Sequence, residues 1–246
     1  MPERTDSARD DAPRRGVFVT GTGTGVGKSV VAASIVAALT ARGHRVAAFK
    51  PAVTGLDEPD TKWPLDHVLL SAATGWQTPE RVAPYIFGPA VSPHLAAELE
   101  DVRIEPTILK GAFDRAAADS EAIVCEGVGG LLVPLSIDPL LRVLDLIKQH
   151  ALPVVVATSP ELGTISDTCL TVDRLRAEGV PVLAVVLSPW PEEPDAMHAS
   201  NLATLKLLLD VPVFVLPPTT PGALAETAAE LPVEEWVGLE GAKKQA

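Results

Sequence analysis

The chain has 246 residues, a formal net charge of -12 at pH 7, 47% hydrophobic residues and a single tyrosine. A chain of this length and hydrophobic content can bury a full core, and we expect one α/β domain over residues 16–246. The acidic charge is unfavourable for binding nucleic acid, and no stretch reaches the roughly 20 apolar residues that a membrane span needs. Residues 1–15 are polar and charged without apolar periodicity, which predicts a disordered tail.

Cysteine use indicates the compartment. Cys125 and Cys169 both lie in apolar segments, where thiols behave as small core residues, and their spacing does not suggest a metal site. Residues 1–15 contain no apolar core for a signal peptide. Together these features predict a protein of the reducing cytoplasm.

Residues 16–42 form the first recognisable unit. A short apolar strand is followed by the loop GTGTGVGKS at 21–29 and by an alanine-rich helix. This order is typical of a phosphate-binding loop, in which glycines turn backbone N–H groups toward a phosphate and the helix N-terminus adds its positive end. Lys28 would neutralise outer phosphates, and the Ser29 hydroxyl suits Mg²⁺. The loop is one residue longer than the common motif, and a glycine-rich turn without a ligand is the alternative.

The second predicted strand, residues 45–49, runs into the sequence KPAVTG at 50–55. Ligands of doubly wound sheets bind beyond the carboxyl ends of the strands, so Lys50 is expected at the same edge as the phosphate loop. A helix is predicted over residues 66–74. Asp66 is either its N-cap or a carboxylate that serves a metal near the phosphates.

The middle of the chain adds a second candidate carboxylate. Ser92 and Pro93 mark the start of a helix, as N-cap and first helical residue, and a further helix covers residues 106–118. The apolar run at 122–125 is typical of a buried parallel strand. It ends at Glu126 in the sequence EGVGG, where nucleotide-hydrolysing folds hold Mg²⁺. A carboxylate that only accepts loop N–H bonds is the alternative.

The remainder of the chain alternates between helices and strands. Helices are expected at residues 139–149, 164–177, 196–208 and 223–230, and strands at 153–157, 181–187 and 211–216. Buried strands that are separated by helices and follow a phosphate loop predict a P-loop NTPase-like doubly wound parallel sheet with helices on both faces.

Five motifs together resemble those of dethiobiotin synthetase: GTGTGVGKS at 21–29, KPAVTG at 50–55, SPH at 92–94, EGVGG at 126–130 and LGT at 162–164. The resemblance covers nearly the whole chain after residue 15. It implies a cyclo-ligase of biotin biosynthesis, which carboxylates 7,8-diaminopelargonate with CO₂. ATP then phosphorylates the carbamate, and the second amine closes the ureido ring of dethiobiotin by expelling phosphate from the carbamic-phosphoric anhydride.

The resemblance also implies the residues of the site. Lys50 and Lys28 are the implied catalytic residues, since phosphoryl transfer needs fixed cations. The implied ligands of Mg²⁺ are Ser29, Asp66 and Glu126. The implied nucleotide-binding residues are Gly25, Val26, Gly27, Lys28, Ser29, Val30, Asp66, Glu126, Gly127, Val128, Gly129, Ser188, Pro189, Pro217, Pro218 and Thr219. The implied contacts of the diamino acid are Thr24, Thr54, Ser92, Leu162, Gly163 and Thr164, with the last three reaching across the interface of a homodimer.

Two segments depart from the family's pattern. Where the family usually carries an Asn-Asp pair that reads adenine, this chain has Ser188 and Pro189, so the choice among ATP and other nucleoside triphosphates stays open. Where many members have Asn-His, this chain has Ser166 and Asp167. Asp167 therefore adds a carboxylate near the expected place of the substrate carboxylate.

Two other functions are compatible with the same sheet and loop. A partitioning or switch ATPase usually carries a second lysine early in its phosphate loop, where this chain has Thr20 and Gly21. A GTPase switch needs an Asn-Lys-x-Asp motif, and the only asparagine is Asn201. An amide ligase of the cobyrinic acid type normally adds a glutaminase domain, and neither Cys125 nor Cys169 has the setting of its nucleophile. A requirement of ATP turnover for the diamino acid and bicarbonate distinguishes the three.

Overall fold

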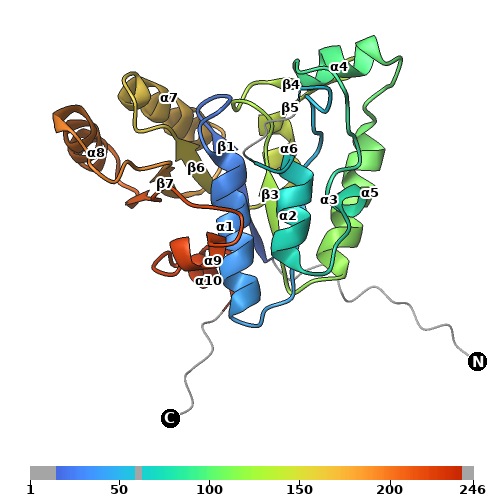
Figure 1. Cartoon of the computed structure of the whole chain (residues 1–246). Coiled ribbons are helices and arrows are strands. Elements are labelled where there is room, and N and C mark those ends of the chain that lie inside the picture. Colours follow the sequence, from blue (N-terminus) through green and yellow to red (C-terminus); the bar gives the residue numbers. More distant parts are fainter. Residues whose placement is uncertain (1–14, 59–62, 240–246) are drawn as a thin grey trace, which may run out of the picture.

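A six-stranded parallel sheet forms the centre of the protein (Figure 1). The computed structural model describes residues 15–58 and 63–239, so the predicted tail lies outside the described residues except for Arg15. The strands follow the order β2-β3-β1-β6-β7-β8. They are β1 (Gly16–Gly21), β2 (Val46–Phe49), β3 (Ala122–Glu126), β6 (Val154–Thr158), β7 (Val182–Leu187) and β8 (Val213–Val215). All their pairings are parallel, which confirms the predicted sheet type.

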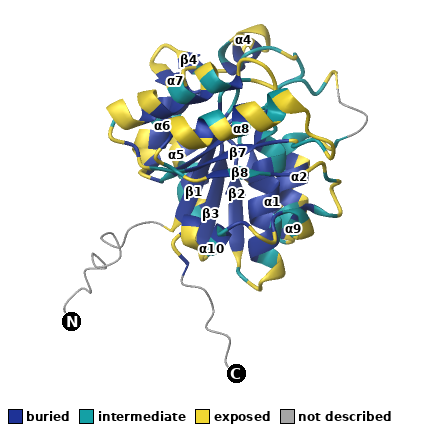
Figure 2. Ribbon diagram, turned by 90° about the vertical axis from the view of Figure 1, so that its left-hand side faces the viewer, coloured by how far each residue is buried: buried dark blue, intermediate teal, exposed yellow. Residues whose placement is uncertain are grey.

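Helices cover both faces of this sheet, as predicted (Figure 1). One face packs against α1 (Lys28–Ala41), α2 (Asp66–Thr74), α9 (Leu224–Thr227) and α10 (Val233–Trp236). The other packs against α5 (Pro106–Ala118), α6 (Val143–His150), α7 (Thr164–Ala177) and α8 (Ala196–Leu208). Because side chains alternate along a strand, Val17 and Val19 of β1 enter one core and Phe18 enters the other. Figure 2 shows the strands as a buried layer and the outer sides of α7 and α8 as exposed.

The position of β1 explains where a ligand can bind. Its neighbours are β3 on one side and β6 on the other. From β1 the chain passes through α1 to β2 at one edge, whereas from β3 it crosses over β1 to reach β6. The winding direction of the sheet therefore reverses at β1, and ligands of such sheets bind at this point, beyond the carboxyl ends of the strands.

One predicted helix is wrong in its first part. Residues 139–149 carry a helical pattern, but Leu140–Arg142 form strand β5, which pairs antiparallel with β4 (Pro134–Ile137). Helix α6 begins only after Arg142, whose backbone N–H donates to the Asp145 carboxylate at 2.8 Å. The Asp138-Pro139 pair lies in the turn of the hairpin. The prediction failed here because proline suits a tight turn as well as the start of a helix.

The remaining elements are short. Helix α4 (Pro93–Leu99) has Ser92 as its N-cap residue, as predicted, although the Ser92 side chain makes no capping hydrogen bond. Helices α3 (Pro79–Val82) and α10 (Val233–Trp236) were not expected from the sequence pattern. Within the described residues, no helix combines the length and the apolar character that crossing a membrane requires.

Candidate functional site

The phosphate loop lies between β1 and α1 and is shaped by glycines. Gly25 and Gly27 have φ angles of 75° and 82°, a region that glycine enters without steric cost. A Cβ added to Gly27 would lie 3.0 Å from Ser188 Oγ, so the backbone at this point is also closely packed. Lys28 starts α1, and its Nζ donates to the Gly23 carbonyl at 2.6 Å. The Lys28 side chain therefore folds back across the loop and contacts the loop backbone.

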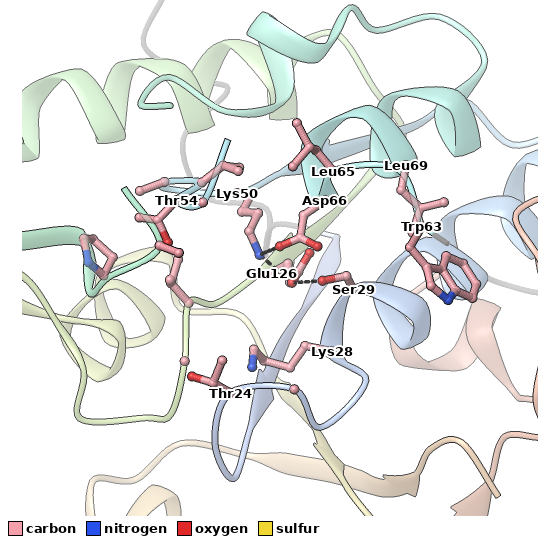
Figure 3. A pocket seen from close by; sticks show the side chains of 18 of the residues that line it. Thr24, Lys28, Ser29, Lys50, Thr54, Trp63, Leu65, Asp66, Leu69 and Glu126 are labelled. Carbon is pink, nitrogen blue, oxygen red and sulfur yellow. Dashed lines mark hydrogen bonds and ion pairs between the residues drawn. The ribbon is translucent and has the colours of Figure 1, made fainter. Parts of the chain in front are cut away.

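Lys50 binds two carboxylates at the centre of the site (Figure 3). Its Nζ lies 2.5 Å from Glu126 Oε1 and 2.9 Å from Asp66 Oδ2. Ser29 Oγ donates to the same Glu126 oxygen at 2.7 Å. These side chains come from the ends of β2 and β3 and the starts of α1 and α2. Asp66 is the first residue of α2, whose N-cap is Leu65, so Asp66 is not the N-cap, and its role as a metal ligand stays a prediction.

Burial and charge act in opposite directions on the protonation of this cluster. Burial raises the pKa of Glu126, against the lowering effect of the Lys50 charge. Burial also acts to raise the pKa of Asp66. The charge of Lys50 and hydrogen bonds from Ser29 and Lys50 outweigh burial and hold this pKa below its usual value. Burial alone would lower the pKa of Lys50, whereas Asp66 and Glu126 raise it overall. Lys50 therefore keeps its charge near neutral pH.

Lys28 differs from Lys50 because it has no carboxylate in hydrogen-bond contact within the described residues. Its side chain is largely buried, and burial together with the nearby Lys50 charge lowers its pKa to about 8. Glu126 and Asp66 raise this pKa, but their effects are smaller than those of burial and Lys50. A bound anion would supply the missing negative charge, so Lys28 is suited to a phosphate.

The cluster offers oxygen ligands for a hard cation. Ser29, Asp66 and Glu126 supply one hydroxyl and two carboxylates, the donor types that Mg²⁺ prefers. Glu126 Oε2 is buried and has no hydrogen-bond partner among the described residues, which is unfavourable unless a cation or donor satisfies it. The described part of the chain holds no group of three or more His, Cys, Asp or Glu residues suited to a metal. Phosphate oxygens and water would therefore complete the coordination.

A cavity of about 710 Å³ surrounds this cluster, a size typical of small-molecule sites. Many of the residues expected at the site line it: Thr24, Gly25, Gly27, Lys28, Ser29, Val30, Lys50, Thr54, Asp66, Ser92, Glu126, Val128 and Gly129. Val26 and Gly127 lie in the same loops without lining the cavity. Segments far apart in the sequence thus meet at the carboxyl edge of the sheet.

The apolar wall of the cavity was missed by sequence reasoning. It includes Trp63, Leu65 and Leu69 (Figure 3), and also Val91 and Val133. Leu69 could have been found, since it lies three residues after Asp66 and therefore on the same side of α2. The only signal for Trp63 is an aromatic side chain in a stretch that otherwise reads as a loop. Val133 lies just before the unexpected β4–β5 hairpin.

The segments expected to contact the base lie beside the phosphate loop and outside this cavity. Ser188 follows β7, is buried and packs against Gly27. The Trp190 N–H donates to the Leu216 carbonyl at 2.7 Å, which joins the segment after β7 to the segment after β8. Pro189 and the stretch Pro217, Pro218 and Thr219 therefore belong to two adjacent loops. Neither loop lines the cavity.

The segment expected to contact the substrate carboxylate also lies outside the cavity of its own chain. Leu162 is 88% exposed, Gly163 is the N-cap residue of α7, and Thr164 is buried in the first turn. Asp167 lies one turn further along the same helix, and a Cβ at Gly163 would lie 3.9 Å from its carboxylate. The chain therefore presents this helix start at its surface.

Solved structures with a similar fold support the architecture. A plasmid partition protein from Borrelia burgdorferi superposes with a TM-score of 0.55 at 13% identity, over 91% of this chain and 100% of that chain. A ParA family ATPase from Chlorobium tepidum gives a TM-score of 0.52 at 14% identity, over 91% of this chain and 96% of that chain. At such low identity these likenesses show the fold alone. A family model described as an AAA domain matches residues 15–222.

The sheet, the phosphate loop and the lysine–carboxylate cluster define a P-loop nucleotide-binding protein of the α/β class. Sequence relatives of the chain identify the family within this class. ATP-dependent dethiobiotin synthetase BioD of Anaeromyxobacter dehalogenans is 37% identical over 82% of this chain and 90% of the relative. The enzyme of the same name from Bacillus subtilis strain 168 is 30% identical over 92% of this chain and 96% of the relative. The chain belongs to the dethiobiotin synthetase family, which confirms the resemblance seen in the motifs.

Proposed function

We propose that this protein is the cyclo-ligase that makes dethiobiotin from 7,8-diaminopelargonate, CO₂ and a nucleoside triphosphate such as ATP. One observation carries the proposal: in a chain of this family, Lys28, Lys50 and the carboxylates of Asp66 and Glu126 line one cavity of small-molecule size. Fixed cations beside a phosphate loop are what phosphoryl transfer requires, because negative charge spreads over the oxygens of the transferred group.

The reaction has three steps in this proposal. One amine of the diamino acid attacks CO₂ and loses a proton, which gives a carbamate. A carbamate oxygen then attacks the γ-phosphorus of ATP, and ADP leaves. Finally the second amine attacks the carbamate carbon, the bond to the phosphate oxygen breaks, and the ureido ring closes with release of inorganic phosphate.

Lys28 and Lys50 have different roles in this proposal. Lys28 belongs to the phosphate loop, so it would bind the outer phosphates of the nucleotide in the ground state. Lys50 directly follows strand β2, and we assign it to the charge that develops between the carbamate and the γ-phosphoryl group. Ser29, Asp66 and Glu126 would hold Mg²⁺, which when bound neutralises phosphate charge. The unpartnered Oε2 of buried Glu126 supports this assignment.

A homodimer would complete the site. The start of α7 is a helix N-terminus suited to a carboxylate, but it does not line the cavity of its own chain. Exposed leucines on and before α7 and on α8, Leu162, Leu170 and Leu207, indicate a surface suited to a second copy. Leu162, Gly163 and Thr164 of one chain would then bind the carboxylate of a diamino acid held by its partner, alongside Thr24, Thr54 and Ser92.

The charge of the chain supports two further parts of the proposal. A net charge of -12 is unfavourable for nucleic acid, so we assign only small-molecule substrates to the protein. Cys125 and Cys169 are not joined to each other by a disulfide, which suits the reducing cytoplasm, where we place the reaction.

A reconstituted assay tests the proposed function. The protein is mixed with Mg-ATP, bicarbonate and 7,8-diaminopelargonate, and dethiobiotin is measured by mass spectrometry. We expect product only when all components are present, and nucleotide hydrolysis that depends on the diamino acid. Hydrolysis that proceeds without the diamino acid, together with no dethiobiotin under any of the four nucleoside triphosphates, would instead support an ATPase of the partitioning or switch type.

A further inference from the structure

A cluster of buried threonine hydroxyls lies behind the site and involves no residue of the cavity. At its centre is Thr158, the last residue of β6. Thr158 Oγ1 lies 3.1 Å from Thr22 Oγ1 of the phosphate loop, 2.9 Å from Thr164 Oγ1, and 3.1 Å from Thr168 Oγ1. Thr164 and Thr168 belong to the first two turns of α7. One hydroxyl therefore contacts both the phosphate loop and the start of α7.

The cluster uses the full capacity of the central hydroxyl. A threonine hydroxyl donates one hydrogen bond and accepts two, and Thr158 has three hydroxyl partners. Thr158, Thr164 and Thr168 are 1%, 4% and 0% exposed, so water cannot easily replace a lost partner. Buried hydroxyl networks of this kind are costly to break and hold their members in one arrangement.

The backbone of Thr158 adds a third connection. Its carbonyl accepts a hydrogen bond from the Ser188 N–H at 2.9 Å. Ser188 in turn packs against Gly27, where even a Cβ would come within 3.0 Å of Ser188 Oγ. Thr158 thus joins the phosphate loop, the segment after β7 and the start of α7, although it lines no part of the cavity itself.

We propose that Thr158 is a positioning residue that couples the nucleotide loop to the start of α7, so that a seated nucleotide orders the residues that receive the substrate carboxylate. The assignment of the substrate carboxylate to α7 rests on the proposed function. The link from Thr22 through Thr158 to Thr164 does not depend on it. We expect a shift of Thr22 on phosphate binding to be transmitted through Thr158 Oγ1 to Thr164, because the buried Thr158 hydroxyl already uses its full hydrogen-bonding capacity. By linkage, the diamino acid and the nucleotide then tighten each other's binding by the same factor.

Thr158→Val removes the hydroxyl and keeps the branched shape, whereas Thr158→Ser keeps the hydroxyl. Thr171→Val is the matched control. Thr171 lies on the same helix, but its hydroxyl donates to the Asp167 carbonyl at 2.7 Å, outside the cluster. Thr22→Val removes the hydroxyl that contacts Thr158 from the phosphate loop. It tests the coupling if Thr158→Val fails to fold.

The first measurement needs no diamino acid. Hydrogen exchange is followed by mass spectrometry for the α7 amides of residues 164–168, with and without a non-hydrolysable ATP analogue. We expect the analogue to protect these amides in the unchanged protein, in Thr158→Ser and in Thr171→Val. Protection should be lost in Thr158→Val and Thr22→Val. Equal protection in Thr158→Val and in the unchanged protein, or no protection in either, would overturn the proposed coupling.

The second measurement is the dissociation constant of 7,8-diaminopelargonate with and without the analogue. We expect the analogue to tighten binding by at least about fivefold in the unchanged protein, and this factor to approach one in Thr158→Val and return in Thr158→Ser. A coupling factor that Thr158→Val leaves unchanged contradicts the proposal. If the diamino acid does not bind at all while the exchange result holds, the proposed substrate is wrong and the link through Thr158 stands.

Discussion

At the end of the site where we expect the phosphates, contacts of 2.5 to 2.9 Å join Lys50 to Asp66 and Glu126 and Ser29 to Glu126, whereas the expected base end consists of two loops rich in proline. The phosphate end can fix a triphosphate through Lys28, a cation and loop N–H groups. The expected base end offers Ser188, whose hydroxyl is buried, and Pro189, which has no N–H. From this difference we expect that the phosphates of the nucleotide supply most of its affinity.

The largest effect is expected from Lys50→Ala. Turnover should fall by at least roughly a hundredfold while nucleotide binding stays largely intact, because Lys50 acts on charge that develops during transfer. Lys28→Ala should weaken nucleotide binding as well as turnover. Equilibrium binding of a fluorescent nucleotide and single-turnover rates separate the two. Equal losses of binding in the two variants would contradict this division.

The Lys50 variant needs a control for folding. Removing Lys50 leaves the buried Glu126 carboxylate without its closest cation, so we also expect a lower midpoint of thermal unfolding. Lys50→Met keeps the apolar stem and serves as the second variant. Turnover lost in Lys50→Met under conditions where circular dichroism shows a folded protein would assign the loss to the charge.

A smaller effect is expected when each carboxylate is neutralised in turn. Glu126→Gln should raise the Mg²⁺ concentration needed for half-maximal turnover by about tenfold or more, because charge interactions are strongest in a buried site. Asp66→Asn should raise it less, since the Asp66 side chain keeps 40% of its surface exposed and that of Glu126 keeps none. Mn²⁺ binding in the presence of ADP, followed by electron paramagnetic resonance, checks the order. A larger effect of Asp66→Asn would make Asp66 the principal ligand.

The comparison predicts weak discrimination among bases. CTP, GTP or UTP should support turnover within about tenfold of ATP, a difference of about 1.4 kcal/mol. An amide side chain can donate and accept at once, and Ser188 and Pro189 supply no such group. Steady-state rates with the four nucleotides decide the matter. A preference for ATP above about a hundredfold would mean that backbone groups, such as those of Pro217, Pro218 and Thr219, read adenine.

The smallest effect concerns protons at the phosphate end. Lys28 has a pKa of about 8 in the free protein, and a bound triphosphate should raise it, since anions favour the charged amine. Above about pH 8 nucleotide binding should therefore take up close to one proton and weaken as the pH rises, whereas near pH 7 little uptake is expected. Titration calorimetry in metal-free buffers of different ionisation enthalpy measures the uptake. Lys28→Met should abolish it, and an uptake that persists in Lys28→Met would point to another group.

The charged part of the site could be predicted from the sequence because each group ends a recognisable strand or starts a helix. Lys50 and Glu126 follow buried strands, and parallel strands end at one edge, so their meeting follows from topology. Asp66 stayed ambiguous, because its place at the start of a helix fits both an N-cap and a carboxylate that serves a metal. The structure excludes the N-cap, since Leu65 holds that position, and places Asp66 Oδ2 2.9 Å from Lys50 Nζ.

Apolar parts of the site could not be predicted in the same way. Trp63 stands alone in a stretch without hydrophobic periodicity, so no sequence pattern places it at the cavity that it lines. Leu140 and Leu141 fit a helical pattern that continues into α6, yet both residues pair with β4 in an antiparallel hairpin. Thr158 looks like the polar end of an apolar strand, and its three hydroxyl partners come from segments that only the fold brings together.

The central place of β1 bears on how the chain matures on the ribosome. β1 is made first among the strands, but its register partners are residues 123–126 of β3 and 154–157 of β6. Neither neighbour has been synthesised when β1 leaves the exit tunnel, and an unpaired apolar strand is prone to aggregation. The nascent chain must therefore keep the Val17–Val19 segment shielded until residues 123–126 and 154–157 have emerged, and the phosphate loop can acquire its full set of contacts only after β6 has emerged.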